Sequence, residues 1–132
     1  PARIMYRLTH AGPDLASDML IYLDDQGDRG LVVESLAYFA YDEERSTRLS
    51  GLADALERDG KLLQGLLAKQ GDDWLSQRLG EAFLLHDDGG PEDFPARYRS
   101  TLDAAATTLG DAGGQESLRQ VIETAAGSEI RR

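Results

Sequence analysis

The two histidines, His10 and His86, are the side chains of this sequence best suited to proton transfer or metal binding near neutral pH. His86 begins a stretch rich in carboxylates and glycines. A histidine beside several carboxylates could hold a divalent cation or act with them in acid–base chemistry. The same composition is typical of a polar connector between helices, and we favour that interpretation. The carboxylates of this stretch are Asp87, Asp88, Glu92 and Asp93.

The other histidine lies close to two aspartates. Asp14 and Asp18 follow His10 by four and eight residues, a spacing that would align all three on one face of a helix. Gly12 and Pro13 interrupt this arrangement, because a helix is expected to begin at Pro13. We therefore predict no metal site around His10.

The acidic turn at residues 24–30 is similar in composition to a calcium-binding loop, but its spacing is wrong. Counted from Asp24, the required glycine and glutamate are replaced by Arg29 and Ser35. The sequence also has no cysteine, no phosphate-binding or dinucleotide-binding glycine motif, and no GxSxG nucleophile motif. We predict no metal site and no cofactor, and we assign no catalytic residue.

The charge of the chain argues against several classes of ligand. The 132 residues include 14 lysines and arginines against 24 acidic residues, a formal net charge of −10. Nucleic acids and anionic membrane surfaces are bound by clusters of basic residues, so we expect neither as a ligand. No apolar run approaches the ~20 residues of a membrane span, and no signal peptide is recognisable. The expected compartment is the cytoplasm.

The acidic charge is concentrated in one segment. Residues 11–45 carry nine acidic residues and two arginines, a net charge of −7, whereas residues 1–10 carry two arginines and no acid. Such a segment is either a solvated surface or a docking face for a basic protein, since complementary charge steers two proteins together. The predicted docking residues are Asp24, Asp25, Asp28, Glu34, Asp42, Glu43 and Glu44, with Tyr38 and Tyr41 as aromatic anchors.

The elements that must position these residues are predominantly helical. The length suits a single domain over 1–132, and no proline occurs between residues 14 and 90. Apolar residues recur at helical spacing in four segments, which predicts a mostly α fold, an irregular bundle of five to seven helices. These segments lie between Ser46 and Gly71, at about 72–85, at 94–109 and around 118–125.

The first third of the chain is less clear. Residues 2–9 favour a short strand or extended arm. Pro13 favours the start of a helix with Leu15, Met19, Leu20 and Leu23 on its apolar face, but residues 19–23 could instead pair with residues 31–33 as a small β-hairpin across the 24–30 turn. For residues 31–44 the apolar spacing favours a helix.

Two short segments resemble known families. Pro1 with the extended segment after it resembles the tautomerase superfamily, which implies an amino-terminal proline acting as a general base, although the helices expected over 46–126 depart from that family's β-α-β pattern. Residues 6–15, YRLTHAGPDL, resemble the passage from wing strand to helix in winged-helix regulators. The second resemblance implies that residues 13–132 form an effector or dimerisation part.

Three functions follow from these observations. We favour a non-enzymatic acidic domain that binds a basic partner protein, in the manner of an inhibitor or immunity protein, a chaperone or an accessory subunit. The first alternative is the C-terminal effector or dimerisation part of a winged-helix transcription regulator. The second is a small enzyme that uses the His86/Asp87/Asp88 loop or Pro1.

Overall fold

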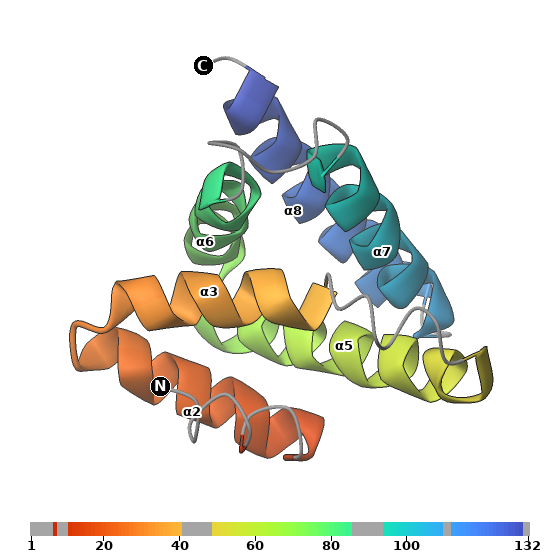
Figure 1. Cartoon of the computed structure of the whole chain (residues 1–132), viewed down its shortest axis with the longest axis horizontal. Coiled ribbons are helices and arrows are strands. Elements are labelled where there is room, and N and C mark those ends of the chain that lie inside the picture. The colour runs from red at the N-terminus through yellow and green to blue at the C-terminus, as the bar shows by residue number, and fades with distance from the viewer. Residues whose placement is uncertain (1–6, 8–10, 41–48, 86–93, 110–111, 131–132) are drawn as a thin grey trace.

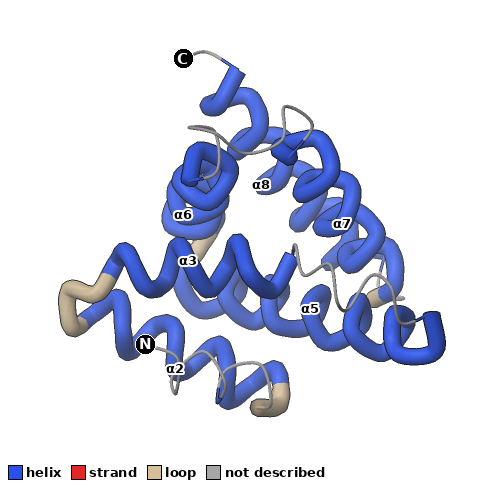
Figure 2. Tube along the Cα trace, in the orientation of Figure 1, coloured by secondary structure: helices blue, strands red, loops and turns tan. Residues whose placement is uncertain are grey.

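The structure, a computed structural model, describes residues 7, 11–40, 49–85, 94–109 and 112–130. This part of the chain forms an all-α bundle of six helices and contains no strand (Figure 2), which confirms the predicted helical class. The helices are α2 (Pro13–Asp25), α3 (Arg29–Ala40), α5 (Leu49–Gln70), α6 (Asp72–Leu85), α7 (Phe94–Thr108) and α8 (Ala112–Ile130).

The helices pack in pairs around two central members, α5 and α6. Helices α2 and α3 form an antiparallel pair (Figure 1), in which α2 packs on α5 and α3 packs on α6. On the other side α5 packs against α7 and α6 packs against α8, while α7 and α8 also contact each other. The described part of the acidic segment, residues 11–40, therefore forms one pair of helices supported by α5 and α6.

Helix α2 ends at Asp25, and a glycine with a left-handed backbone conformation follows two residues later. Gly27 has a φ of 85°, and its N–H donates to the carbonyl of Asp24 over 3.0 Å. The next N–H, of Asp28, donates to the carbonyl of Leu23 over 2.9 Å. These two bonds are the Schellman arrangement that satisfies the last carbonyls of a helix, and glycine adopts the required φ without strain. The turn at 26–28 thus ends one helix and allows α3 to begin at Arg29.

The connection between α5 and α6 is also a single glycine. Gly71 has a φ of 89°, and its N–H donates to the carbonyl of Leu67 over 2.9 Å. The carbonyl of Gly71 accepts from the N–H of Leu75 over 3.3 Å, within the first turn of α6. Gly71 is therefore the only residue between the end of α5 and the start of α6, and the chain turns at this glycine.

The β-hairpin considered for residues 19–33 is wrong. Both segments are helical, and their buried residues follow helical spacing instead of the alternation that a half-buried strand requires. The turn residues are explained by the helix-ending glycine at 27. The buried residues of these two segments are Ala16, Ser17 and Leu20 in α2, and Val32, Val33, Ser35, Leu36 and Ala37 in α3.

The strand or arm expected at residues 2–9 falls outside the described residues, except for Arg7. Arg7 is helical, and its carbonyl accepts a bond of 2.9 Å from the N–H of Ala11. At this position the extended conformation is therefore not found. The C-terminal part of the helix expected at 31–44 also falls outside the described residues, because α3 is described only to Ala40.

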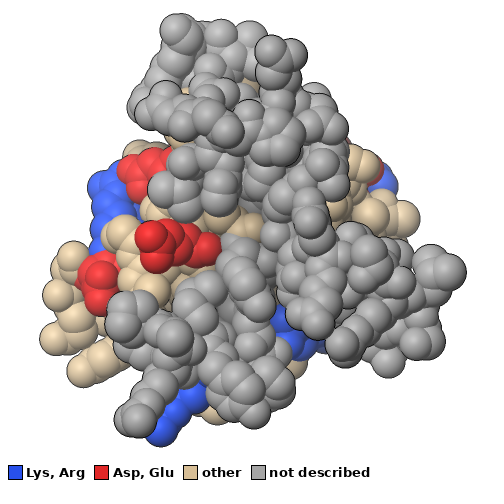
Figure 3. Space-filling view, in the orientation of Figure 1, with Lys and Arg blue, Asp and Glu red and all other residues tan. Residues whose placement is uncertain are grey.

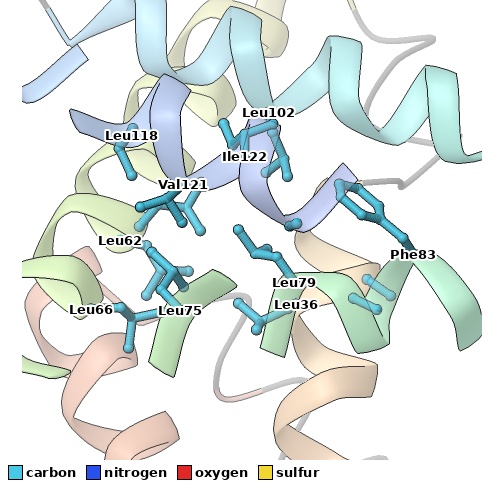
Figure 4. Packing of buried hydrophobic residues seen from close by; sticks show 14 of the residues in the cluster. Leu36, Leu62, Leu66, Leu75, Leu79, Phe83, Leu102, Leu118, Val121 and Ile122 are labelled. Atoms are coloured by element: carbon cyan, nitrogen blue, oxygen red, sulfur yellow. The ribbon is translucent and has the colours of Figure 1, made fainter. Parts of the chain in front are cut away.

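The hydrophobic core draws on all six helices, and Figure 4 shows its centre. Phe83 of α6 is fully buried against α8 residues, and leucines of α5, α6 and α7 complete the interior. Burying a side chain of this size contributes roughly 1.5–3 kcal/mol relative to leaving it exposed. The largest buried side chains are Phe83, Leu20, Leu36, Leu66, Leu75, Leu79, Leu102, Leu118, Ile122 and Val32.

Glycines allow two helices to approach α5 closely. A Cβ atom at Gly60 would lie 2.5 Å from the carbonyl oxygen of Ala105, so α7 passes directly over this glycine. A Cβ at Gly65 would lie 3.3 Å from Oγ of Ser17, where α2 crosses. Ser17 therefore meets Gly65 where α2 crosses α5, on the face of α2 that also buries Ala16 and Leu20.

Candidate functional site

The residues on which the enzyme alternative depends lie outside the described part of the chain. They are Pro1 and the loop at 86–93. Within the described ranges no group of three or more histidine, aspartate or glutamate side chains could hold a metal ion. No helix in those ranges is both long and apolar enough to cross a membrane.

Asp24, the first of the predicted docking residues, binds side chains of α6. One carboxylate oxygen accepts from Nε1 of Trp74 over 2.8 Å. Arg78 donates through Nε to Oδ1 over 3.1 Å and through Nη2 to Oδ2 over 3.2 Å, and its guanidinium also lies over the Trp74 ring at 5.1 Å. The Asp24 side chain is only 13% exposed. Asp24 therefore joins α2 to α6, and we leave it out of the docking surface proposed below.

A second charged contact joins α3 to α6. Arg29, the first residue of α3, donates through Nε to Oε2 of Glu81 over 2.9 Å and pairs with Oε1 through Nη2. Arg29 is one of only two basic residues in the acidic segment, so its charge is already neutralised by Glu81. The exposed part of the α2–α3 pair is more acidic for this reason.

Three of the predicted docking residues do lie on the surface. Asp25, Asp28 and Glu34 are exposed, and none of them forms a salt bridge with another described residue. Figure 3 shows acidic side chains over α3 and over the turn between α2 and α3. Tyr38 lies on α3, but its side chain is outside the description. The remaining predicted residues, Tyr41, Asp42, Glu43 and Glu44, are outside the described ranges.

The outer face of α2 carries an apolar column that the sequence analysis did not identify. Leu15 is 58% exposed and Tyr22 is 63% exposed, and between them lies Met19, which is half-buried and also packs against the core. Their spacing of four and three residues places them on one face of the helix. The sequence analysis grouped Leu15 with Met19, Leu20 and Leu23. The buried face of α2 instead carries Ala16, Ser17 and Leu20, and Leu15 and Tyr22 are turned toward solvent. We call Leu15, Met19 and Tyr22 the apolar column.

An acidic column runs alongside the apolar one. Asp14, Asp18 and Asp25 are all exposed, and their spacing of four and seven residues again places them on one face of α2. Asp18 is paired with Lys69 of α5 over 2.7 Å, and the same ammonium donates to Ser17 over 3.1 Å. We call Asp14, Asp18 and Asp25 the acidic column.

A pocket of about 330 Å³ opens beside the two columns. Its described lining comes from Asp18, Met19, Tyr22 and Leu23. This volume is at the lower end of the range for sites that accept a small ligand or an anchoring side chain, roughly 300–1,000 Å³. The pocket, the apolar column and the acidic column form one continuous surface on α2.

The sequence signal for this surface was present but ambiguous. The buried face of α2 carries two small residues, Ala16 and Ser17, beside Leu20, so side-chain size in the sequence does not identify this face as the buried one. Tyr22 is exposed on the opposite side of the helix from Ser17.

Comparison with protein-family models, with curated protein sequences and with solved structures gave no significant match in any of the three.

Proposed function

We propose that this chain is a non-enzymatic protein-binding domain that engages a basic partner protein through the outer surface of α2 and the adjoining part of α3. The observation that carries the proposal is the combination of an exposed apolar column with exposed acidic residues on the same helix. An isolated exposed leucine is ordinary in a folded protein, but a group of large apolar side chains next to a pocket is typical of an interaction site.

The apolar column supplies a contact area of the kind found at the centre of interfaces. Leu15 and Tyr22 are the two large hydrophobic side chains that are mostly exposed within the described part of the chain. Aromatic residues, tyrosine among them, are enriched at binding hot spots because they bury a large area with few rotatable bonds. We therefore expect Tyr22 to be a central contact residue that the partner buries.

The acidic residues favour a basic partner. A net charge of −10 gives the whole chain a negative field, and the exposed carboxylates concentrate it along α2 and at the start of α3. Complementary charge raises the association rate and discriminates against partners of the wrong sign. From the residues predicted by sequence we retain Asp25, Asp28 and Glu34, and Tyr38, Tyr41, Asp42, Glu43 and Glu44 stay a prediction.

The test compares two double variants of equal charge. Asp25→Asn with Glu34→Gln alters the proposed surface, and Glu116→Gln with Glu123→Gln removes two exposed charges from α8 as the matched control. Proteins captured from the source cells with the natural chain would be purified, and their affinity measured for each variant at increasing salt.

We expect a basic protein whose affinity falls with salt and falls further with the α2–α3 variant than with the α8 variant. Equal effects of the two variants, or binding that does not respond to salt, would contradict the proposed docking surface.

A further inference from the structure

The backbone of α2 offers a partner no hydrogen-bonding edge. Within a helix the N–H and C=O groups bond to each other, and the described ranges contain no strand to which a peptide could add another. A partner can therefore contact this surface only through side chains. Among common modes of peptide recognition, this favours an amphipathic helix laid along the apolar face.

The dimensions of the apolar column fit such a helix. Leu15 and Tyr22 are seven residues apart, which is about 10.5 Å along the axis or two helical turns. Two helices pack at roughly 8–10 Å between their axes, with side chains of one fitting between those of the other. The pocket of about 330 Å³ beside Met19 and Leu23 offers space for one large apolar side chain of the incoming helix.

Charge distinguishes between two possible occupants of this surface, a second copy of the chain and a basic helix of another protein. A second copy of the chain would bring another net charge of −10, and an antiparallel pairing of two α2 helices would place both acidic columns on the same edge. Like charges placed opposite each other across an interface are unfavourable. A basic helix instead places lysines or arginines beside Asp14 and Asp25, and it can compete with Lys69 for Asp18.

We infer that the partner binds α2 through a basic amphipathic helix, with its apolar face on Leu15, Met19 and Tyr22, one large apolar side chain in the adjoining pocket, and its lysines or arginines along Asp14, Asp18 and Asp25. This inference rests on the proposed function and specifies the chemistry and conformation of the partner segment.

The experiment selects peptides without assuming their conformation. A displayed library of random peptides of about 16 residues, roughly 24 Å when helical, is selected on the natural chain and counter-selected on the Tyr22→Ser variant. Tyr22 is mostly exposed, so this variant should keep the fold, which circular dichroism checks. Gln120→Ser, on the exposed face of α8, is the control substitution.

The expected peptides carry apolar residues at helical spacing with lysines or arginines on an adjacent face. They should become helical on binding and shift the amide NMR signals of α2. Tyr22→Ser should lower the affinity of these peptides by about tenfold or more, and Gln120→Ser should leave their affinity unchanged.

Other outcomes separate this inference from the proposed function. Basic peptides that bind α2 without helical spacing would overturn the inference and leave the proposed function standing. Peptides that are not basic, or that shift signals away from α2, would overturn both. A library that yields no binder dependent on Tyr22 would also overturn the inference. Sedimentation showing a dimer that Tyr22→Ser abolishes would assign the surface to a second copy instead.

Discussion

The carboxylate of Asp24 and the guanidinium of Arg78 form a two-point ion pair that joins α2 to α6, with donor–acceptor distances of 3.1 and 3.2 Å. Both side chains are largely buried, at 13% and 9% exposure. Trp74 donates to the same carboxylate and stacks with the same guanidinium. This pair therefore helps to fix the helix that carries the proposed binding surface.

Removing one member of this ion pair should destabilise the folded protein. We expect Asp24→Ala to lower the free energy of unfolding by about 3 kcal/mol, because Arg78 would be left buried without its counter-charge. Urea denaturation measures the loss. The double variant Asp24→Leu with Arg78→Met should recover much of it, since it leaves neither charge unpaired. Equal losses in the single and double variants would show that the ion pair is not the cause.

A methyl group at Gly60 should also destabilise the fold. Alanine has the higher helix propensity, but its Cβ would lie 2.5 Å from the carbonyl oxygen of Ala105. The backbones of α5 and α7 would have to separate, and we expect Gly60→Ala to cost about 1–3 kcal/mol by urea denaturation.

The matched control for this substitution is Gly30→Ala in α3. A Cβ at Gly30 meets nothing within 4 Å. We therefore expect Gly30→Ala to stabilise the protein by about 0.4–1 kcal/mol, through helix propensity and a less flexible unfolded chain. If both substitutions changed stability in the same direction, the close approach of α5 and α7 would not be the determining factor.

Lys69 should act as an internal competitor for the basic partner. Its ammonium pairs with Asp18 over 2.7 Å, and both side chains are substantially exposed. Exposed pairs of this kind contribute only about 0–1 kcal/mol, so Lys69→Gln should change the unfolding midpoint little. The same variant frees Asp18 and should raise the affinity for a basic α2-binding peptide several-fold by titration calorimetry. Arg119→Gln, which removes an exposed pair with Asp103 of α7 at 2.9 Å, is the comparison, and the same gain in both would indicate a general charge effect.

The Glu57 carboxyl should titrate below the ordinary range for glutamate. Its pKa is lowered by the hydrogen bond from Lys61, at 2.8 Å, and by the charge of that ammonium. A lowered pKa means that the stabilisation is present above the ordinary value and is lost as the pH falls through the pKa of the folded state. An NMR titration of the side-chain carboxyl carbon measures the midpoint. Lys61→Gln should return it toward the ordinary value, and an unchanged midpoint would contradict the assignment of the cause.

The helices were predictable where apolar spacing and breaking residues agreed. The helix at 72–85 was predicted with its observed bounds, because Gly71 precedes two aspartates suited to a helix start and the apolar residues keep helical spacing throughout. Residues 19–33 were ambiguous, since a short apolar run satisfies both helix and strand patterns. The hydrogen bonds from the N–H groups of Gly27 and Asp28 to the last turn of α2 identify a helix end, and these bonds are not visible in the sequence.

The candidate site was predictable only in part. Asp25, Asp28 and Glu34 were expected at the surface and are exposed. Asp24 was placed among them because sequence position alone does not reveal a partner 54 residues away. Leu15 was grouped with Leu20 by helical spacing, but Leu15 is mostly exposed, whereas Leu20 is buried and Ser17 packs on Gly65 of α5. Such close packing depends on two distant segments at once.

The glycines of α5 have a consequence for how the protein unfolds. Glycine weakens an isolated helix by about 1 kcal/mol relative to alanine, and α5 carries Gly60 and Gly65 in its interior. The same glycines allow α7 and α2 to pack closely on α5. This packing stabilises α5, whose own helix propensity is lowered by the glycines. A peptide of residues 49–70 should therefore be mostly coil in isolation, and α2, α5 and α7 should lose their structure in one cooperative transition.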